Sequence, residues 1–386
     1  MLSRAGICAV IVNTCAVTAE AERQCGQAVR KIARENPGAI IFVTGCAATR
    51  NPGLFEKIPD VVVIPNEKKM ELRAYLDKIS QKNRGNSCPE INGNFDTENK
   101  LSKKFIQIQN GCNHDCTYCV TRLLRGPAVS FEYDEILANV RAATAAGFGE
   151  IVLTGVDAAS YLHIENGRPF LISDLCQRLL CDAPEIERLR LSSVDPAVPA
   201  IRDIIEIMKV ERRFMPHLHL SMQSGSDTIL RAMRRRHTAE MVRELVRRAD
   251  GKVSFSWDII CGFPGETDEL FNETLELARE LKPIRIHAFP FSPRPGTVAA
   301  EMPNQIPQNT ARARVREITA VAAENLHEFM QNKVGNVCQV LVESDNVART
   351  PDDIPVKIAG TAIPPRTICD IKITGATDDM LLGVNI

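Results

Sequence analysis

The stretch Gly111-Cys112-Asn113-His114-Asp115-Cys116-Thr117-Tyr118-Cys119 contains three cysteines with the spacing C-x3-C-x2-C. Thiolates at this spacing can ligate three irons of a cubane iron–sulfur cluster and leave the fourth iron without a protein ligand. A metal site with an open coordination position performs chemistry rather than a purely structural role. A small molecule with an amine and a carboxylate can chelate that iron, and S-adenosylmethionine is the one associated with radical chemistry.

The alternative is a zinc knuckle built on Cys116 and Cys119, with His114 nearby. A structural zinc site needs a fourth ligand, which usually comes from a second close pair of cysteines or histidines. The next pair, Cys176 and Cys181, lies far along the chain and has the looser spacing C-x4-C. The pattern therefore favours an iron–sulfur cluster over zinc.

The composition limits the class of protein. The chain has 386 residues, of which 44% are hydrophobic, and this is enough for two or three domains with cores of their own. Its formal net charge of −1 means that any RNA binding would depend on local basic patches. No apolar run approaches the roughly 18 residues of a membrane span. The 13 cysteines, without a secretion signal, favour metal ligation in a reducing cytoplasm over disulfides.

Residues 1–80 alternate predicted strands and helices, which indicates a parallel α/β sheet domain. Continuously apolar, β-branched runs predict strands buried on both faces at 9–13, 40–44 and 61–64. A helix with acidic residues first and basic residues last is predicted over 18–36. Cys15 and Cys46 each follow the C-terminal end of a predicted strand. Because such ends share one edge of a parallel sheet, we expect these two thiols to lie close together.

Residues 81–102 are polar and rich in turn formers, which predicts a linker, and Cys88 within it has no partner at metal-ligand spacing. From 103 to 331, strands alternate with helices, and the six predicted strands are 105–109, 151–154, 188–192, 217–221, 253–260 and 284–289. This alternation predicts a partial (β/α)6 barrel with its functional residues at the C-terminal ends of the strands.

Three of these strands place polar side chains on one face and apolar side chains on the other. The polar faces comprise Arg188, Arg190 and Ser192; His217, His219, Ser221 and Gln223; and Ser254, Ser256 and Asp258. Helices should cover the outside of the barrel and require apolar contacts there, so we expect the polar faces to line a lumen that holds a ligand. The alternative is that they point outward on a half-exposed sheet.

Residues 332–386 lose helical periodicity, and short strands are predicted at 337–342, 367–374 and 380–384. This pattern is typical of a small antiparallel all-β barrel, a fold that often binds RNA. The segment has five Lys/Arg against seven Asp/Glu, so its charge gives no support to RNA binding. A plain packing module is the alternative.

Nearly the whole chain resembles the radical S-adenosylmethionine methylthiotransferases. The sequences Asn13-Thr-Cys-Ala-Val-Thr18 and Thr44-Gly-Cys46 resemble the cluster-binding domain of that family, and the cysteine loop followed by Arg125-Gly126 resembles its radical core. Further family-like blocks are 153–157, 218–226 and 258–267. The C-terminal barrel is placed like the RNA-binding TRAM domain of the family. Among the branches, the chain is most similar to enzymes that thiomethylate threonylcarbamoyladenosine beside the tRNA anticodon.

The resemblance implies two [4Fe-4S] clusters. The first is held by Cys112, Cys116 and Cys119, and its open iron chelates S-adenosylmethionine, whose cleavage yields a radical that takes the hydrogen from C2 of the adenine. The second, auxiliary cluster is held in part by Cys15 and Cys46 and supplies sulfur. The candidates for contacts with S-adenosylmethionine are, by position, Gly155, Ser192, Ser193 and Gln223.

Two of these candidates have an alternative role. The alternative for Gly155 is that it only permits close approach of the backbone, and the alternative for Gln223 is that it only orders a loop. The implied partners are the anticodon stem-loop of tRNA, S-adenosylmethionine and an unidentified electron donor. We expect a cytoplasmic monomer without a membrane association.

The chain departs from the family pattern in two places. Family members have a third auxiliary cysteine upstream of the Asn-Thr-Cys motif, whereas this chain begins at about the second strand. We therefore expect the N-terminal domain to be truncated, as a misplaced start codon would produce, and the auxiliary cluster to be in doubt. Cys8 and Cys25 are expected to be small buried apolar residues rather than replacements. Thr121-Arg122 stands where the family usually has a proline, outside the ligand set.

Three other functions are open: methylthiolation of isopentenyladenosine in tRNA, modification of an aspartate in a ribosomal protein, and a non-catalytic tRNA-binding role. A charge run follows the fourth barrel strand and comprises Arg231, Arg234, Arg235, Arg236, Arg243, Arg247 and Arg248. Such a run is usually a solvated helix face. Its first part follows a strand end directly, so it can instead flank the cleft and contact tRNA phosphates.

Overall fold

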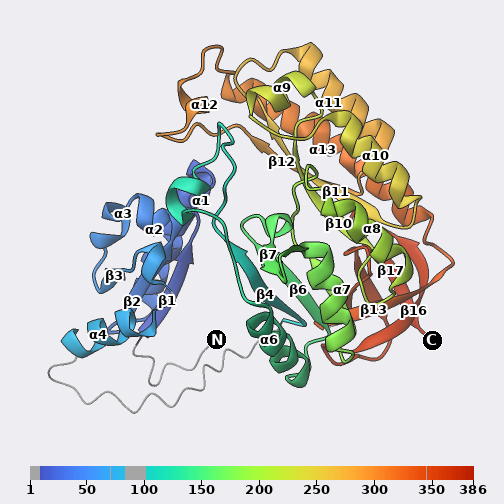
Figure 1. The fold of residues 1–386 in the computed structure, drawn as a ribbon, viewed down its shortest axis with the longest axis horizontal. Helices are drawn as coiled ribbons and strands as arrows, with labels where there is room; N and C mark the ends of the chain where they lie inside the picture. Colours follow the sequence, from blue (N-terminus) through green and yellow to red (C-terminus); the bar gives the residue numbers. More distant parts are fainter. Residues whose placement is uncertain (1–8, 70, 83–100, 345) are drawn as a thin grey trace. The chain divides into compact units, whose positions relative to one another are not determined.

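The computed structural model describes residues 9–69, 71–82, 101–344 and 346–386 (Figure 1). Its contacts divide the chain into two units, each assembled from several segments. Unit 1 comprises 1–97, 112–127 and 292–301, and unit 2 comprises 98–111, 128–291 and 302–386. The cysteine loop therefore belongs to the same unit as the N-terminal sheet, so unit 1 contains Cys15, Cys46 and the C-x3-C-x2-C motif.

Unit 1 is built on a parallel sheet with the order β1-β2-β3, whose strands are β1 (Ala9–Thr14), β2 (Ile40–Gly45) and β3 (Val61–Val63). The helical segments of its first part are α1 (Ala19–Glu35), α2 (Cys46–Arg50), α3 (Gly53–Glu56), η1 (Asn66–Lys68) and α4 (Leu72–Lys82). The hydroxyl of Thr18 caps α1 by accepting from the amide of Ala21. The central strand β2 is buried throughout, as its apolar sequence predicts. The three strands and α1 lie where the sequence predicts them.

Unit 2 contains six parallel strands in chain order: β4 (Lys103–Asn110), β6 (Glu150–Gly155), β9 (Leu189–Leu191), β10 (His217–Gln223), β11 (Ser254–Cys261) and β12 (Arg285–Pro290). They form one sheet β4-β6-β9, with the short strand β5 (Val129–Ser130) antiparallel at its edge, and a second sheet β10-β11-β12. Parallel bridges from Leu189 to Phe214 and from Val194 to Leu220 connect the two sheets. All six barrel strands predicted from the sequence are confirmed.

Helices cover one side of these sheets. They are α6 (Tyr133–Ala145), η2 (Ala158–Ser160), α7 (Ile172–Asp182), α8 (Ala200–Val210), α9 (Asp227–Ala232), α10 (Ala239–Ala249), α11 (Asp268–Leu281) and α13 (Gln308–Gln331). Leu218, Leu220 and Trp257 are fully buried in the core that these helices share with the strands. On the opposite face, His219 and Asp258 remain partly accessible. The polar faces of β10 and β11 are therefore turned away from the helices, as predicted.

The C-terminal strands form a closed barrel with the order β13-β14-β15-β17-β16. Its strands are β13 (Val337–Ser344), β14 (Val347–Arg349), β15 (Pro355–Ala359), β16 (Ile368–Ala376) and β17 (Leu381–Asn385). The prediction of a purely antiparallel barrel is wrong at one pair, because β15 and β17 run parallel. After β15 the chain crosses to β16, which is not the neighbour of β15 in the barrel. The last strand, β17, then fills the position between β15 and β16, where it runs parallel to β15.

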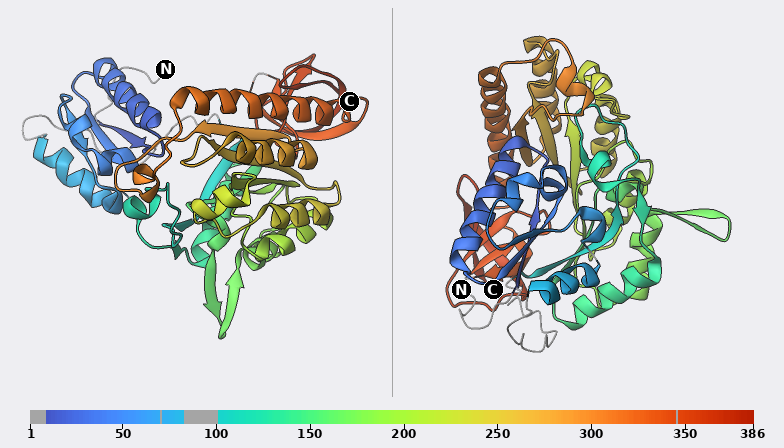
Figure 2. Two further views of the ribbon diagram at one scale, coloured as in Figure 1. Left: turned by 90° about the horizontal axis from the view of Figure 1, so that it is seen from above. Right: turned by 90° about the vertical axis from the view of Figure 1, so that its left-hand side faces the viewer.

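A hairpin that the sequence analysis missed projects from unit 2 (Figure 2). Its strands are β7 (Leu162–Glu165) and β8 (Arg168–Leu171), and its turn residues Asn166 and Gly167 both have positive φ. Asn-Gly between two short runs is the usual signal of a two-residue hairpin turn, so this element was readable from the sequence.

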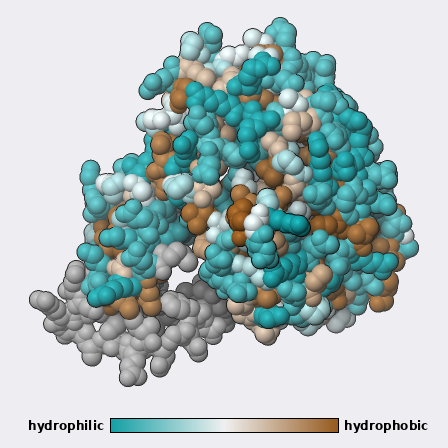
Figure 3. Space-filling model, in the orientation of Figure 1, coloured by the Kyte–Doolittle hydropathy of each residue, from teal (hydrophilic) through white to brown (hydrophobic). Residues whose placement is uncertain are grey.

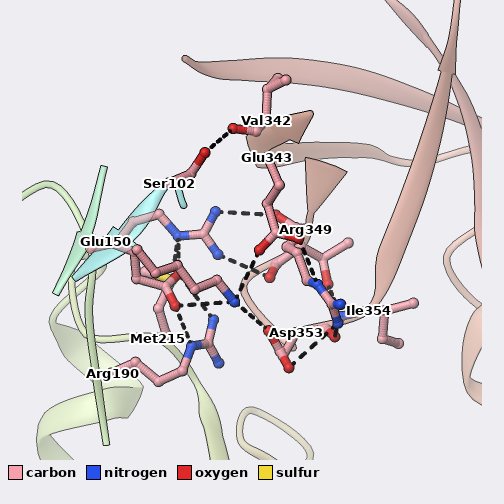
Figure 4. A network of polar contacts seen from close by, with 12 residues as sticks. Ser102, Glu150, Arg190, Met215, Val342, Glu343, Arg349, Asp353 and Ile354 are labelled. Carbon is pink, nitrogen blue, oxygen red and sulfur yellow. Dashed lines mark hydrogen bonds and ion pairs between the residues drawn. The ribbon is translucent and has the colours of Figure 1, made fainter. Parts of the chain in front are cut away.

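Arg188 and Arg190 differ from the prediction that they line a ligand-holding lumen. They bond the buried carboxylate of Glu150, with Nε–Oε distances of 3.0 and 2.7 Å respectively (Figure 4). Their guanidinium groups also donate to carbonyl oxygens of the C-terminal barrel at Arg349, Thr350 and Pro351. Arg188 directly precedes β9 and Arg190 lies within it, so both connect this strand to the C-terminal barrel.

No helix in the described ranges is long and apolar enough to cross a membrane. Hydrophilic residues cover most of the surface that is visible in Figure 3.

Candidate functional site

The cysteine loop is organised around its sulfur atoms. The thiols of Cys112, Cys116 and Cys119 are half-buried. The amide of His114 donates to Cys112 Sγ at 3.4 Å, and the amide of Thr121 donates to Cys119 Sγ at the same distance. Amide hydrogen bonds to sulfur stabilise thiolates and tune iron–sulfur clusters. The donor set and its backbone contacts therefore fit an iron–sulfur cluster.

Backbone hydrogen bonds fix the loop within unit 1. The amide of Cys112 donates to the carbonyl of Gly126 at 3.1 Å, beyond helix α5 (Thr121–Arg125). The amide of Ala299, in helix α12 (Val298–Glu301), donates to the carbonyl of Thr117 at 2.8 Å. Gly126 has a φ of 74°, and nothing lies within 4 Å of a Cβ built there. Glycine is thus required at 126 for backbone conformation rather than for space.

Cys15 and Cys46 leave the same edge of the N-terminal sheet, as the sequence predicts. They directly follow Thr14 and Gly45, which are paired in register between β1 and β2. A Cβ at Gly45 would lie 2.3 Å from the carbonyl oxygen of Thr14, so only glycine allows the two strand ends to approach this closely. Cys15 is exposed and Cys46 is half-buried.

The expectation that Cys25 is a buried apolar residue is met in part. The side chain is half-buried and packs against the core of unit 1, and its thiol also accepts a hydrogen bond from the amide of Cys15 at 3.3 Å. The start of α1 folds back over the end of β1, and this contact places the sulfur beside Cys15. No metal-ligand spacing in the sequence signalled the contact. Cys8 and Cys88 lie outside the described residues, as does most of the predicted linker.

The sulfur of Cys46 accepts two side-chain hydrogen bonds. Arg125 Nε donates to Cys46 Sγ at 3.0 Å, and Asn66 Nδ2 donates to the same sulfur at 3.6 Å and to the carbonyl of Leu124 at 3.2 Å. Lys69 lies close enough to interact with this group. Burial lowers the pKa of Lys69, the positive charge of Arg125 lowers it further, and Cys46 opposes both effects. Sequence reasoning found Arg125 only as part of the family-like Arg-Gly pair and missed Asn66.

Gly155 lies at the C-terminal end of β6, against Gln109 of β4. A Cβ at Gly155 would lie 2.9 Å from Gln109 Oε1, so glycine is required for close packing of the two strands. The same oxygen accepts from the amide of Asp157 at 2.9 Å, and Gln109 Nε2 donates to the carbonyl of Gly111 at 2.8 Å. Gln109 therefore orders two strand ends at once, and no sequence motif indicated this role.

The other candidate contacts of S-adenosylmethionine lie at the ends of β9 and β10. Ser192 Oγ is buried and makes no hydrogen bond within the described part of the chain, whereas Ser193 is exposed. Gln223 is half-buried with a φ of 69°, just after a shift of strand register that begins at Leu220. A non-glycine residue at positive φ in a strand end is an unusual conformation that often marks a functional position.

The inner face of β10 and β11 carries a chain of polar contacts. His217 bonds the hydroxyls of Ser254 and Ser256 at 2.9 and 3.0 Å. Ser256 also contacts His219 Nδ1 at 2.7 Å, and His219 Nε2 lies 3.0 Å from Asp258 Oδ1. Burial, and then the charge of Arg190, lower the pKa of His217 to about 3, so this ring is neutral at physiological pH. The face therefore offers ordered hydrogen-bonding groups, which include a neutral His217 and the carboxylate of Asp258.

The arginine run separates into two classes. Arg231, Arg234 and Arg236 are exposed, and of these Arg236 also pairs with Asp195 at 3.1 Å. The side chain of Arg235 is only 6% exposed; it pairs with Asp195 at 3.3 Å and donates to the carbonyl of Ser221 at 2.8 Å. The expectation that Arg235 faces RNA is therefore wrong, because a buried carboxylate already holds it.

The later arginines of the run lie on α10 and pair with carboxylates of neighbouring helices or of the same helix. Arg243 contacts Glu280 at 2.8 Å and Arg248 contacts Glu206 at 3.3 Å. Arg247 pairs with Glu240. The arginines of α10 therefore form a solvated helix face, which is the alternative to a contact with tRNA phosphates.

Comparisons with known proteins agree with this geometry. The model of the radical SAM superfamily matches residues 106–278, and the model described as uncharacterized protein family UPF0004 matches residues 5–64. The threonylcarbamoyladenosine tRNA methylthiotransferase MtaB of Rickettsia prowazekii is 40% identical over 90% of this chain and 84% of that protein. The tRNA-2-methylthio-N(6)-dimethylallyladenosine synthase of Ehrlichia canis is 33% identical over 87% of this chain and 79% of that protein.

A similar solved structure is the radical S-adenosylmethionine methyltransferase TsrM of Kitasatospora setae, with cobalamin and a [4Fe-4S] cluster bound. Its TM-score is 0.58 at 16% identity, and the match covers 76% of this chain and 65% of that chain, so it supports the fold alone. The radical core implies that this chain binds an iron–sulfur cluster and S-adenosylmethionine. By its extended identity to these enzymes, the chain belongs to the radical SAM methylthiotransferase family that includes the threonylcarbamoyladenosine tRNA enzymes.

Proposed function

We propose that this protein adds a methylthio group to C2 of N6-threonylcarbamoyladenosine next to the anticodon of tRNA. The observation that carries the proposal is the 40% identity, over 90% of the chain, to an enzyme named for that reaction. Dimethylallyladenosine in tRNA is the second candidate, because a synthase of that nucleoside is 33% identical over 87% of the chain. The proposed partners are tRNA, S-adenosylmethionine and an electron donor, in the cytoplasm.

The cysteine loop holds the proposed radical cluster through Cys112, Cys116 and Cys119. When bound there, the cluster supplies the electron that splits S-adenosylmethionine. The protein orients its ligands through backbone amides and limits access of water to the half-buried sulfur atoms. We assign contacts with S-adenosylmethionine to Gly155, Ser192, Ser193 and Gln223. The buried hydroxyl of Ser192, without a protein partner in the described ranges, is suited to such a contact.

We assign Cys15 and Cys46 as two of the protein ligands of a second, auxiliary cluster. Its support is that both thiols leave one edge of the sheet and that the unit holding them also holds the cysteine loop. The proposed domains are the cluster-binding domain at 1–80, the linker at 81–102, the radical core at 103–331 and the TRAM-like barrel at 332–386. Iron and sulfide analysis of anaerobically reconstituted protein should give about eight irons per chain, since each [4Fe-4S] cluster contributes four.

The modified nucleoside tests the proposal directly. We expect tRNA from a deletion strain to contain threonylcarbamoyladenosine without its 2-methylthio form, which nucleoside mass spectrometry measures. Return of the gene should restore the methylthio nucleoside. Loss of the methylthio form of dimethylallyladenosine instead would favour the second candidate. An unchanged tRNA profile with an altered ribosomal protein aspartate would overturn both tRNA assignments.

Arg231 and Arg234, which are both exposed, are the proposed contacts with tRNA phosphates. Substitution of both Arg231 and Arg234 by alanine should weaken tRNA binding and reduce the slope of log K against log salt by about one per lost phosphate contact. Arg235 is left out of the test because its ion pair with Asp195 is buried. Arg247→Ala removes an exposed arginine that pairs with Glu240 and serves as the control. Identical slopes for the double variant and the wild type in a filter-binding titration would remove these two residues from the interface.

A further inference from the structure

The Arg125-Gly126 pair contacts one cysteine from each of the two sets in unit 1. The side chain of Arg125 donates from Nε to Cys46 Sγ at 3.0 Å. The backbone carbonyl of Gly126 accepts from the amide of Cys112 at 3.1 Å. Two consecutive residues therefore connect the proposed ligands of both clusters, and all of these atoms belong to a single unit.

The contact with Cys46 is built from several directions. Arg125 and Cys46 are both half-buried. Helix α5, which ends at Arg125, packs against α2, which begins at Cys46, and against η1. Asn66 of η1 completes the arrangement because its amide donates both to Cys46 Sγ and to the carbonyl of Leu124, the neighbour of Arg125.

The acceptor of Arg125 is unusual. Arginine generally pairs with carboxylates or phosphates, for which its planar donor group is suited. Within the described ranges, however, Arg125 makes no ion pair with a carboxylate, and the sulfur of Cys46 is its side-chain acceptor. Other arginines of unit 1 follow the general rule, as Arg50 and Arg294 do with Glu22. A cationic donor directed at a thiol is suited to a thiolate that carries negative charge.

We propose that Arg125 is a positioning residue for the auxiliary cluster: its guanidinium donates to the ligating sulfur of Cys46 and makes the cluster easier to reduce. The inference rests on the proposed auxiliary cluster. Reduction adds negative charge to a cluster, and a cationic N–H donor at a ligand sulfur stabilises that charge, which raises the reduction potential. The carbonyl of Gly126 accepts from the amide of Cys112, the first cysteine of the radical-cluster motif. The segment 125–126 therefore also fixes the position of one proposed cluster site relative to the other.

Redox titration by electron paramagnetic resonance tests the role of Arg125. The full-length protein is reconstituted without oxygen, both unaltered and with Cys112, Cys116 and Cys119 changed to alanine so that the auxiliary cluster is observed alone. In both backgrounds we expect Arg125→Ala to lower the ratio of reduced to oxidised auxiliary cluster about tenfold at fixed potential, which is about 59 mV for a one-electron couple. Arg125→Lys, which keeps the charge, should restore most of the reduced fraction.

The control is Arg34→Ala, which removes an exposed arginine from α1 in the same unit. It should leave the midpoint potential unchanged. Loss of the auxiliary irons in Arg125→Ala but not in Arg125→Lys would also support the proposal, because the contact then holds the ligand itself. An unchanged potential in Arg125→Ala would overturn it. So would about four irons in the unaltered protein, because no auxiliary cluster would then exist.

These measurements are independent of the identity of the nucleoside. A potential shift in a protein that modifies a different nucleoside would leave the role of Arg125 standing and overturn only the proposed substrate. Normal methylthiolation of threonylcarbamoyladenosine with an unchanged potential in Arg125→Ala would support the proposed substrate and overturn the role of Arg125.

Discussion

Substitution of Cys116 by alanine will remove about four irons per chain and reduce cleavage of S-adenosylmethionine to background. Two remaining thiolates of the loop cannot hold a cubane cluster with one open iron, so the loss should be complete rather than partial. The same result is expected for Cys112→Ala and Cys119→Ala. Iron and sulfide analysis gives the cluster content, and release of deoxyadenosine under a strong reductant gives the cleavage rate.

Cys181→Ser provides the matched control, because Cys181 is an exposed thiol outside the motif. It should retain the full iron content and full cleavage. A Cys116→Ala protein that keeps its irons and still cleaves S-adenosylmethionine would contradict the assignment of the radical cluster. Colourless wild-type protein after anaerobic reconstitution would do so as well.

The elements that could be predicted are those whose signal is local. The cysteine loop is readable because its ligands lie within nine consecutive residues, 111–119. The buried strand β2 is readable because its apolar run has no polar face, and β10 because its polar residues alternate with apolar ones. The placement of Cys15 and Cys46 at one edge of the sheet was predicted because the C-terminal ends of parallel strands share an edge, and their separation in the chain does not indicate it.

The features that escaped prediction depend on partners distant in sequence. Arg188 and Arg235 appear in the sequence as polar residues on a strand and in a charge run, but each is buried against a carboxylate from another element. The contact between Arg125 and Cys46 joins residues 79 positions apart, and no pattern of either segment indicates it. Burial of a charge is decided by tertiary packing, so hydrophobic periodicity cannot reveal it.

A cluster of such charges connects the β4-β6-β9 sheet to the C-terminal barrel (Figure 4). Glu150 has no exposed side-chain surface and contacts Arg188, Arg190 and Lys103. Lys103 also contacts Asp353 of the C-terminal barrel at 2.7 Å. Burial alone would raise the pKa of Glu150, but the charges of the two arginines and Lys103 lower it below the ordinary value. The carboxylate is therefore ionised and compensates several buried positive charges.

Replacement of Glu150 by alanine should destabilise the protein by roughly 3–5 kcal/mol, the usual cost of removing one partner of a buried ion pair. The reason is that Arg188 and Arg190 would remain buried without a counter-charge. Urea unfolding followed by tryptophan fluorescence measures the loss, because Trp257 is fully buried in the hydrophobic core that the two sheets share. A triple variant with Glu150→Leu, Arg188→Met and Arg190→Met should recover most of the stability, since it removes the charges together.

The pH dependence of this loss has a defined sign. A carboxyl whose pKa is lowered by folding stabilises the protein above its unfolded pKa, about 4.3 for glutamate, and the contribution disappears as the pH falls through the lower, folded pKa. The difference in unfolding free energy between wild type and Glu150→Gln should thus be full at neutral pH and shrink on acidification below about pH 4. Glu273→Gln, at an exposed site further along α11, is the control for loss of a carboxylate. A difference that stays constant from neutral to acidic pH would mean that Glu150 acts through packing rather than charge, and the electrostatic account of this interface would then be wrong.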